Sequence, residues 1–223
     1  MKIDSKNRSL VNIVGAPLIV FSIMYNHYSF YTLIFCITIF SFYEYINLIK
    51  SKSQLTFLKL FLGFLWISSL GLFIPLYQSL AIPKEFVLII FCSVWMTDSA
   101  AYVMGKKFGK RKIFPSVSAN KTWVGSVSGL IFSILFLLII YSNFNKAYWP
   151  NNFQLIDILF IGFITGLFSQ FGDFLESYFK RNLGVKDSSN LLLGHGGFLD
   201  RFDSIYAVSF ATYFYLLLMG YYG

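Results

Sequence analysis

The sequence predicts an all-α fold: a polytopic transmembrane helical bundle with about 7–8 spans and an active site at its cytoplasmic face. Hydrophobic residues make up 57% of the 223 residues and charged residues only 13%, whereas soluble domains carry about 25% charged residues. The apolar residues gather in stretches of about 20, the length that crosses a bilayer. This composition excludes a soluble globule, a disordered chain and a small disulfide-stapled fold.

The first three apolar stretches cover residues 10–26, 28–49 and 56–80. The first is too long for a signal peptide, lacks a small-residue cleavage site and is followed at once by another span. The third contains Pro75, which can divide a membrane helix into two half-helices. The prediction of seven or eight spans depends on this segment.

Four further spans are predicted at residues 85–105, 122–141, 153–172 and 202–222. The span 85–105 contains Asp98 among small residues, and an acid inside such a helix indicates an aqueous pocket or a basic partner. A separate short amphipathic helix is expected at 171–181. The whole chain, 1–223, is interpreted as one membrane domain with N-terminal helices over 1–84 and a catalytic part over 85–223.

The basic residues predict the orientation of these spans. With seven spans and a cytoplasmic N-terminus, nearly all of the 18 Lys and Arg residues lie on the cytoplasmic side, and Lys59, Lys84 and Lys146 are the exceptions. The net charge of +8 therefore reflects membrane topology, and no nucleic acid partner is predicted. Two long polar segments, 105–121 and 180–203, fall on this side and are where we expect the chemistry.

Four carboxylates in or beside the second polar segment are spaced to share a site. Asp173 and Glu176 are three residues apart, as are Asp200 and Asp203, so each pair lies on one helix face. Mg2+ is often held by one or two carboxylates together with substrate phosphates. Nearby bases suit phosphate oxygens, namely Lys180, Arg181, Lys186 and Arg201. The alternative is a solvated helix end with paired acids and bases.

Two further features are typical of phosphate binding. The turn Gly-His-Gly-Gly at 194–197 brings the backbone close to a ligand and leaves N–H groups free to meet an anion, unless it is a plain loop. Ser118, Lys121 and Thr122 precede the fifth span. Ser118 is expected to cap that helix, and Lys121 is either a phosphate ligand or only a topology charge.

The residues of the second polar segment resemble the signature of the phosphatidate cytidylyltransferase family, also called CDP-diglyceride synthases. The matching residues are SYFKR at 177–181, KD at 186–187 and HGGFLDRFD at 195–203. The resemblance extends to GDFLES at 172–177, to DSAAYVMGKKFGK at 98–110 and to SANKTWVG at 118–125. Leu193, Asn120 and Val124 stand where the family usually has Pro, Lys and Glu.

The resemblance implies that the chain transfers the cytidylyl group of CTP to phosphatidic acid, forming CDP-diacylglycerol and pyrophosphate. It implies Mg2+ and a possible K+ as cofactors, a homodimer, and the cytoplasmic side of a bacterial inner membrane as the place of the site. The implied catalytic residues are Asp173, Asp200, Lys180, Arg201 and Asp187, and the metal ligands are Asp173, Asp200 and Asp203. The implied substrate-binding residues are Ser118, Lys121, Thr122, Arg181, Lys186, His195, Gly196 and Gly197.

Two other functions stay open. A CTP-dependent kinase of a polyprenol-type lipid shares the membrane and the nucleotide, although the HGG-x-x-DRxD pattern argues against it. A non-enzyme is the other: a transporter, or a non-catalytic homologue of the family. The clustering of polar residues at one face and the absence of an internal repeat argue against a transporter, whereas Val124 and Leu193 keep the non-catalytic homologue open.

Overall fold

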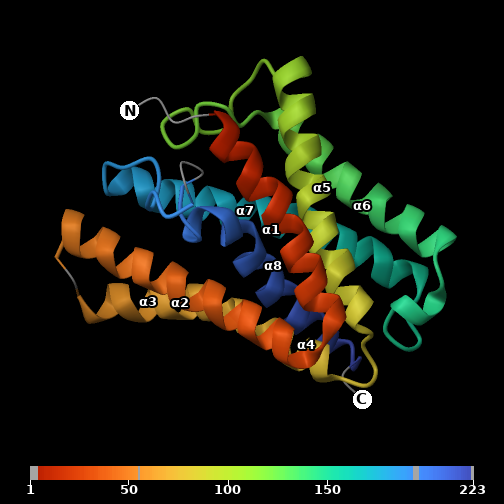
Figure 1. Cartoon of the computed structure of the whole chain (residues 1–223). Coiled ribbons are helices and arrows are strands. Elements are labelled where there is room, and N and C mark those ends of the chain that lie inside the picture. The colour runs from red at the N-terminus through yellow and green to blue at the C-terminus, as the bar shows by residue number, and fades with distance from the viewer. Residues whose placement is uncertain (1–4, 55, 193–195, 222–223) are drawn as a thin grey trace.

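The computed structural model describes residues 5–54, 56–192 and 196–221, and all regular elements within these ranges are helices (Figure 1). The helices run back and forth, so the start of α1 and the end of α8 lie at opposite ends of the bundle. This arrangement confirms the all-α helical bundle.

The N-terminal half forms two long helices and one interrupted helix. They are α1 (Ser5–Tyr25), α2 (His27–Lys52), α3 (Phe57–Ser68), η1 (Ser69–Leu72) and α4 (Phe73–Gln78). Asn26 ends the tight link between α1 and α2, because its side chain accepts a hydrogen bond from the Ser29 N–H. The third predicted span is one segment, Phe57–Gln78, with a 3₁₀ turn in the middle. Pro75 has no N–H for the Gly71 carbonyl, which explains a change of helix type at that turn.

The C-terminal half consists of α5 (Lys84–Phe108), α6 (Trp123–Asn143), η2 (Lys146–Tyr148), α7 (Leu155–Asn182) and α8 (Leu199–Leu218). Helices α5, α6, α7 and α8 pack on one another, and α1 and α2 cover this group. The expectation of a separate amphipathic helix at 171–181 is wrong, because those residues are the last turns of the continuous helix α7.

Small and hydroxyl side chains hold α5, α6 and α7 close together. A Cβ atom on Gly162 would come within 2.8 Å of the Ile134 backbone, so α6 and α7 touch there. The hydroxyls of Ser93, Ser133 and Thr165 are buried and lie 2.7–3.0 Å from one another, one from each helix. Their hydrogen bonds satisfy polar groups that lipid cannot hydrate.

Five helical segments in the described part of the chain are long and apolar enough to cross a membrane: α2, the segment Phe57–Gln78, α5, α6 and α7. A shorter apolar stretch, Val14–Tyr25, belongs to α1. With the composition, these helices identify an integral membrane protein. The number of spans stays a prediction.

Candidate active site

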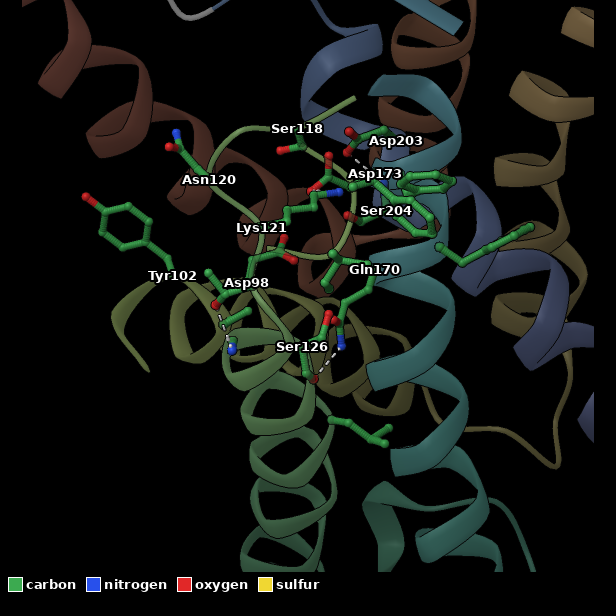
Figure 2. Close-up of a pocket in the computed structure, with 18 of the residues that line it drawn as sticks. Asp98, Tyr102, Ser118, Asn120, Lys121, Ser126, Gln170, Asp173, Asp203 and Ser204 are labelled. Carbon is green, nitrogen blue, oxygen red and sulfur yellow. Dashed lines mark hydrogen bonds and ion pairs between the residues drawn. The ribbon is translucent and has the colours of Figure 1, made fainter. Parts of the chain in front are cut away.

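A cavity of about 750 Å³ lies where α5, α6, α7 and the start of α8 meet (Figure 2). Its volume is within the range of about 300–1,000 Å³ that ligand pockets occupy. The loop between α5 and α6 forms one wall through Ser118, Asn120 and Lys121. The cavity therefore joins the two polar segments that the sequence singles out.

The loop between α5 and α6 is closed at its base by backbone hydrogen bonds. Ile113 N–H donates to the Lys121 carbonyl at 3.1 Å, and Trp123 N–H donates to the Arg111 carbonyl at 3.1 Å. Thr122 caps α6, because its hydroxyl accepts from the Gly125 N–H at 3.1 Å. The expectation that Ser118 caps this helix is wrong. Ser118 instead lines the cavity.

The crossing of α7 and α8 brings acidic side chains together. A Cβ atom on Gly172 would collide with the backbone carbonyl of Asp203, so only glycine allows the two helices to approach this closely. The approach places Asp173 and Asp203 on the wall of the same cavity. Negative charge on either of them disfavours negative charge on the other, and both act in the same way on Asp98.

One lysine faces these acids. Lys121 Nζ lies 2.9 Å from Asp173 Oδ2, and the two side chains are 26% and 39% exposed. Figure 2 shows Lys121, Asp173 and Asp203 pointing into the same space, with Asp98 and Tyr102 on the α5 side. Lys121 Nζ is itself shielded from water and makes no hydrogen bond besides this ion pair among the described residues. A shielded ammonium needs an anionic partner, and a phosphate oxygen suits that place as well as Asp173 does.

The other part of the cavity is apolar. Helices α6 and α7 line it with Val127, Leu130, Leu167 and Phe171. Val127, Leu167 and Phe171 are each at least 43% exposed, so their side chains also form the outer surface of these helices. The cavity thus places charged groups next to a surface that suits hydrocarbon.

Lys180 and Asp200 form a buried pair, of which Asp200 lines the cavity and Lys180 does not. Lys180 Nζ lies 2.5 Å from Asp200 Oδ1 and 3.0 Å from Glu176 Oε1. Asp200 also accepts hydrogen bonds from the Ser188 and Gly197 N–H groups. It lies just before the predicted span 202–222. Burial acts to raise the pKa of Asp200, but the Lys180 ammonium and these hydrogen bonds outweigh it and hold the pKa below its usual value. Asp200 is therefore a carboxylate at neutral pH.

The N–H groups at the end of the Gly-His-Gly-Gly turn and just after it already have hydrogen-bond partners within the protein. Gly197 N–H donates to Asp200 at 2.8 Å, while Phe198 N–H and Leu199 N–H donate to Glu44 at 3.0 and 2.9 Å. The expectation that these groups await a ligand anion is wrong for these three, because the protein's own carboxylates occupy them. Gly196 and Gly197 are buried, and their role in substrate binding stays a prediction. His195 lies outside the described residues.

The remaining predicted residues lie away from the cavity wall. Arg181 is exposed, and its guanidinium donates to the carbonyls of Val117 and Val185, which ties α7 to both loops. Lys186 and Asp187 are exposed in the loop before α8. Of the proposed set, the cavity is lined by Ser118, Lys121, Thr122, Asp173, Asp200, Arg201 and Asp203.

Comparison with known proteins decides the family. The model of the Cytidylyltransferase family matches residues 82–219 of the chain. The chain belongs to the cytidylyltransferase family. The match includes α5 to α8, so all four helices that line the cavity are in the family's part of the chain. The resemblance predicted from the signature residues is thereby confirmed.

Individual relatives agree with this assignment. A phosphatidate cytidylyltransferase of Staphylococcus saprophyticus is 40% identical over 159 residues, which are 70% of this chain and 58% of the relative. One from Staphylococcus aureus is 37% identical over the same shares. One from Haemophilus influenzae is 43% identical over 134 residues, 60% of this chain and 46% of the relative. The matched part thus spans about half the length of these relatives.

Within this member of the cytidylyltransferase family, sequence reasoning left several cavity residues out of the site. Asp98 and Tyr102 are four residues apart on α5, and Gln170 precedes Asp173 by one turn of α7, so helical spacing is the signal that finds them. Asp98 faces the aqueous pocket that its position in a span indicates. Glu44 comes from α2, and nothing in its local sequence predicts its contacts with the start of α8.

The described residues contain no group of three or more His, Cys, Asp or Glu side chains arranged to hold a metal ion on their own. The cavity does carry the oxygen donors that Mg2+ prefers, in Asp173 and Asp203. Asp200 is already surrounded by donors. A metal ion at this site of the cytidylyltransferase family would thus be bound by carboxylate oxygens of the protein together with phosphate oxygens of a substrate.

Proposed function

We propose that this chain transfers the cytidylyl group of CTP to phosphatidic acid and releases pyrophosphate. An oxygen of the lipid phosphate forms a bond to the α-phosphorus of CTP, and the bond between that phosphorus and the bridging oxygen of the β-phosphate breaks. The lipid product is CDP-diacylglycerol. Membership of the cytidylyltransferase family and the names of the relatives support this reaction.

The observation that carries the proposal is the two-sided cavity. Its charged part holds Lys121 beside Asp173, and its apolar part lies between α6 and α7. To bind phosphatidic acid, a site needs a charged surface for the phosphate and an apolar surface for the acyl chains, close enough for one lipid molecule to contact both. CTP reaches the charged part from water, and the acyl chains lie against Val127, Leu167 and Phe171.

The residues of the chain reduce the repulsion between phosphate groups. The lipid phosphate is already anionic, so its attack requires no strong general base. Lys121 exchanges Asp173 for a phosphate oxygen, and Arg201 on the cavity wall offers a second cation. Lys180 stays paired with Asp200 and Glu176 and holds the start of α8 in place.

We infer Mg2+ as the cofactor from the donor set. Asp173 and Asp203 would hold it, because two repelling carboxylates in one cavity match a hard divalent cation. When bound, Mg2+ supplies positive charge to the phosphate oxygens. K+ as a second cation, a homodimer and a site at the cytoplasmic side of a bacterial inner membrane complete the proposal. Asp200 is left out of the ligand set, because its oxygens already accept from Lys180, Ser188 and Gly197.

The position of the label in the product tests the reaction. Purified protein in phosphatidate vesicles with Mg2+ receives CTP labelled on either the α- or the γ-phosphate. Cytidylyl transfer moves the α-label into the lipid fraction and leaves the γ-label in pyrophosphate.

The alternatives give different outcomes in the same assay. A lipid kinase moves the γ-label into the lipid fraction, and it does so with a polyprenol as the acceptor. Lipid without either label, at every Mg2+ concentration and with either acceptor, would identify a non-catalytic homologue and contradict the proposal.

A further inference from the structure

The carboxylate of Glu44 is buried, and the residues that contact it are distant from it in the sequence. Glu44 belongs to α2, and its side chain is 2% exposed. It accepts hydrogen bonds from the Ser189 hydroxyl at 2.6 Å and the Ser188 hydroxyl at 3.2 Å. The Phe198 and Leu199 N–H groups donate to it at 3.0 and 2.9 Å. All four donors belong to the loop before α8 or to the start of that helix.

This carboxylate takes the place of a local helix cap. The residue before α8, Phe198, offers no side-chain cap, although the first turn of a helix leaves N–H groups without partners. Glu44 supplies the missing acceptor from another helix, and the positive end of the α8 dipole favours its charge. A buried carboxylate is costly unless it is hydrogen-bonded, and these four donors offset that cost while they hold Glu44 in place.

Glu44 and Asp200 hold the same stretch of chain from two sides. Gly197 N–H donates to Asp200, and the next two N–H groups donate to Glu44. The Ser188 hydroxyl lies between the two carboxylates, 2.9 Å from Asp200 Oδ2 and 3.2 Å from Glu44 Oε2. A Cβ atom on Gly197 would collide with Glu44, which explains why this position has no side chain.

The consequence reaches the cavity wall. Asp200, Arg201 and Asp203 all follow the Glu44-bound turn directly and line the cavity. If the turn is released, the first turn of α8 frays and these three side chains lose their fixed positions. The family match begins at residue 82, so Glu44 lies outside the part of the chain that the match covers.

We propose that Glu44 is a positioning residue: it fixes the loop before α8 and the first turn of α8 in the arrangement that the reaction needs. The inference rests on the proposed cytidylyl transfer, but the anchoring contact itself is independent of the reaction. Glu44→Ala removes all four acceptor contacts. Glu44→Gln keeps one oxygen acceptor and turns an NH2 group toward the remaining donors.

A matched control is available on α7. Asp157 is also a buried carboxylate, 1% exposed, which accepts from Gln154 N–H at 2.8 Å and from the Tyr215 hydroxyl at 2.7 Å. It caps the start of α7, about 35 Å along that helix from Lys180. Asp157→Ala therefore removes a similar contact far from the cavity.

The first measurement is hydrogen exchange of the full-length protein in vesicles, read on peptides that cover 196–203. We expect Glu44→Ala to speed this exchange about tenfold or more, Glu44→Gln to speed it less, and Asp157→Ala to leave it unchanged. Exchange in Glu44→Ala equal to wild type would overturn the anchor. This result holds or fails whether or not the protein turns over CTP.

The second measurement is steady-state turnover of CTP with phosphatidate. We expect kcat of Glu44→Ala to fall at least tenfold with a KM for CTP within about threefold of wild type, and Glu44→Gln to recover part of the loss. Equal losses of kcat in Glu44→Ala and Asp157→Ala would show a general stability effect and overturn the positioning role. An inactive wild type would instead contradict the proposed function.

Discussion

At the residue scale, the Lys121 ion pair and the Lys180 ion pair have different roles. Lys121 lines the cavity and is paired with Asp173, whose side chain is 39% exposed, so a phosphate oxygen can take the place of that one partner. Lys180 is 8% exposed and lies between Glu176 and Asp200, so removing one partner would leave a buried charge. We therefore assign substrate contact to Lys121 and loop support to Lys180.

Substitution of Lys121 tests this assignment. Lys121→Ala should lower kcat/KM for CTP about 10–100-fold, because a hydrogen bond from a charged donor to phosphate contributes about 1.5–3 kcal/mol. The protein should remain folded, since Lys121 belongs to a loop and Asp173, the partner left behind, is accessible to water. The measurement is turnover at limiting CTP.

The matched control is Lys112→Ala in the same loop. Lys112 is exposed and does not line the cavity, so its loss should change kcat/KM less than about twofold. Equal effects of the two substitutions would mean that only the total charge of the loop matters, and the contact assigned to Lys121 would be wrong.

The sequence allows the acids to be predicted better than the bases. Asp200 and Asp203, which are three residues apart, both line the cavity as the helical spacing predicts, whereas of Asp173 and Glu176 only Asp173 lines it. Arg181 and Lys186 have suitable chemistry but point elsewhere. Which base faces the cavity depends on how the loops fold over the helix ends, and local spacing contains no such information.

At the element scale, the crossing of α7 and α8 positions the acids. Gly172 contacts the Asp203 carbonyl at that crossing, and Asp173 is the next residue. The sequence predicts both helices but divides α7 into a span and a separate amphipathic helix. A change from apolar to amphipathic pattern marks the end of the hydrophobic stretch, whereas the backbone hydrogen bonds of α7 continue to Asn182.

Gly172→Ala tests the crossing. The added methyl group collides with backbone rather than with a flexible side chain, so the two helices must move apart. We expect a loss of about 1–3 kcal/mol of stability, measured as a lower midpoint of thermal unfolding in detergent, and a loss of turnover.

Gly15→Ala is the control for the loss of glycine itself. No atom lies within 4 Å of a Cβ at this position on α1, so alanine should be neutral or should stabilise the helix by roughly 0.5–1 kcal/mol. A Gly172→Ala protein as stable and active as wild type would contradict the role given to the crossing.

At the scale of the whole molecule, the bundle brings together residues that are distant in the chain. The cavity combines α5, α6, α7 and α8, and Glu44 adds α2. Apolar stretches predict the helix bounds to within about five residues except at the end of α7, because lipid requires every backbone group to be bonded within a helix. The pairing of helices was not predictable, since it depends on contacts between small residues such as Gly162 and Ile134.

The central claim is that the cavity around Asp173 performs cytidylyl transfer, and one measurement tests it most directly. The rate at which label from α-labelled CTP enters phosphatidate vesicles is compared for wild type, Asp173→Asn and Glu85→Gln, an acid on α5 that does not line the cavity. We predict a rate lower by about 100-fold or more in Asp173→Asn and a wild-type rate in Glu85→Gln. A wild-type rate in Asp173→Asn, with all three proteins equally folded, would contradict the claim.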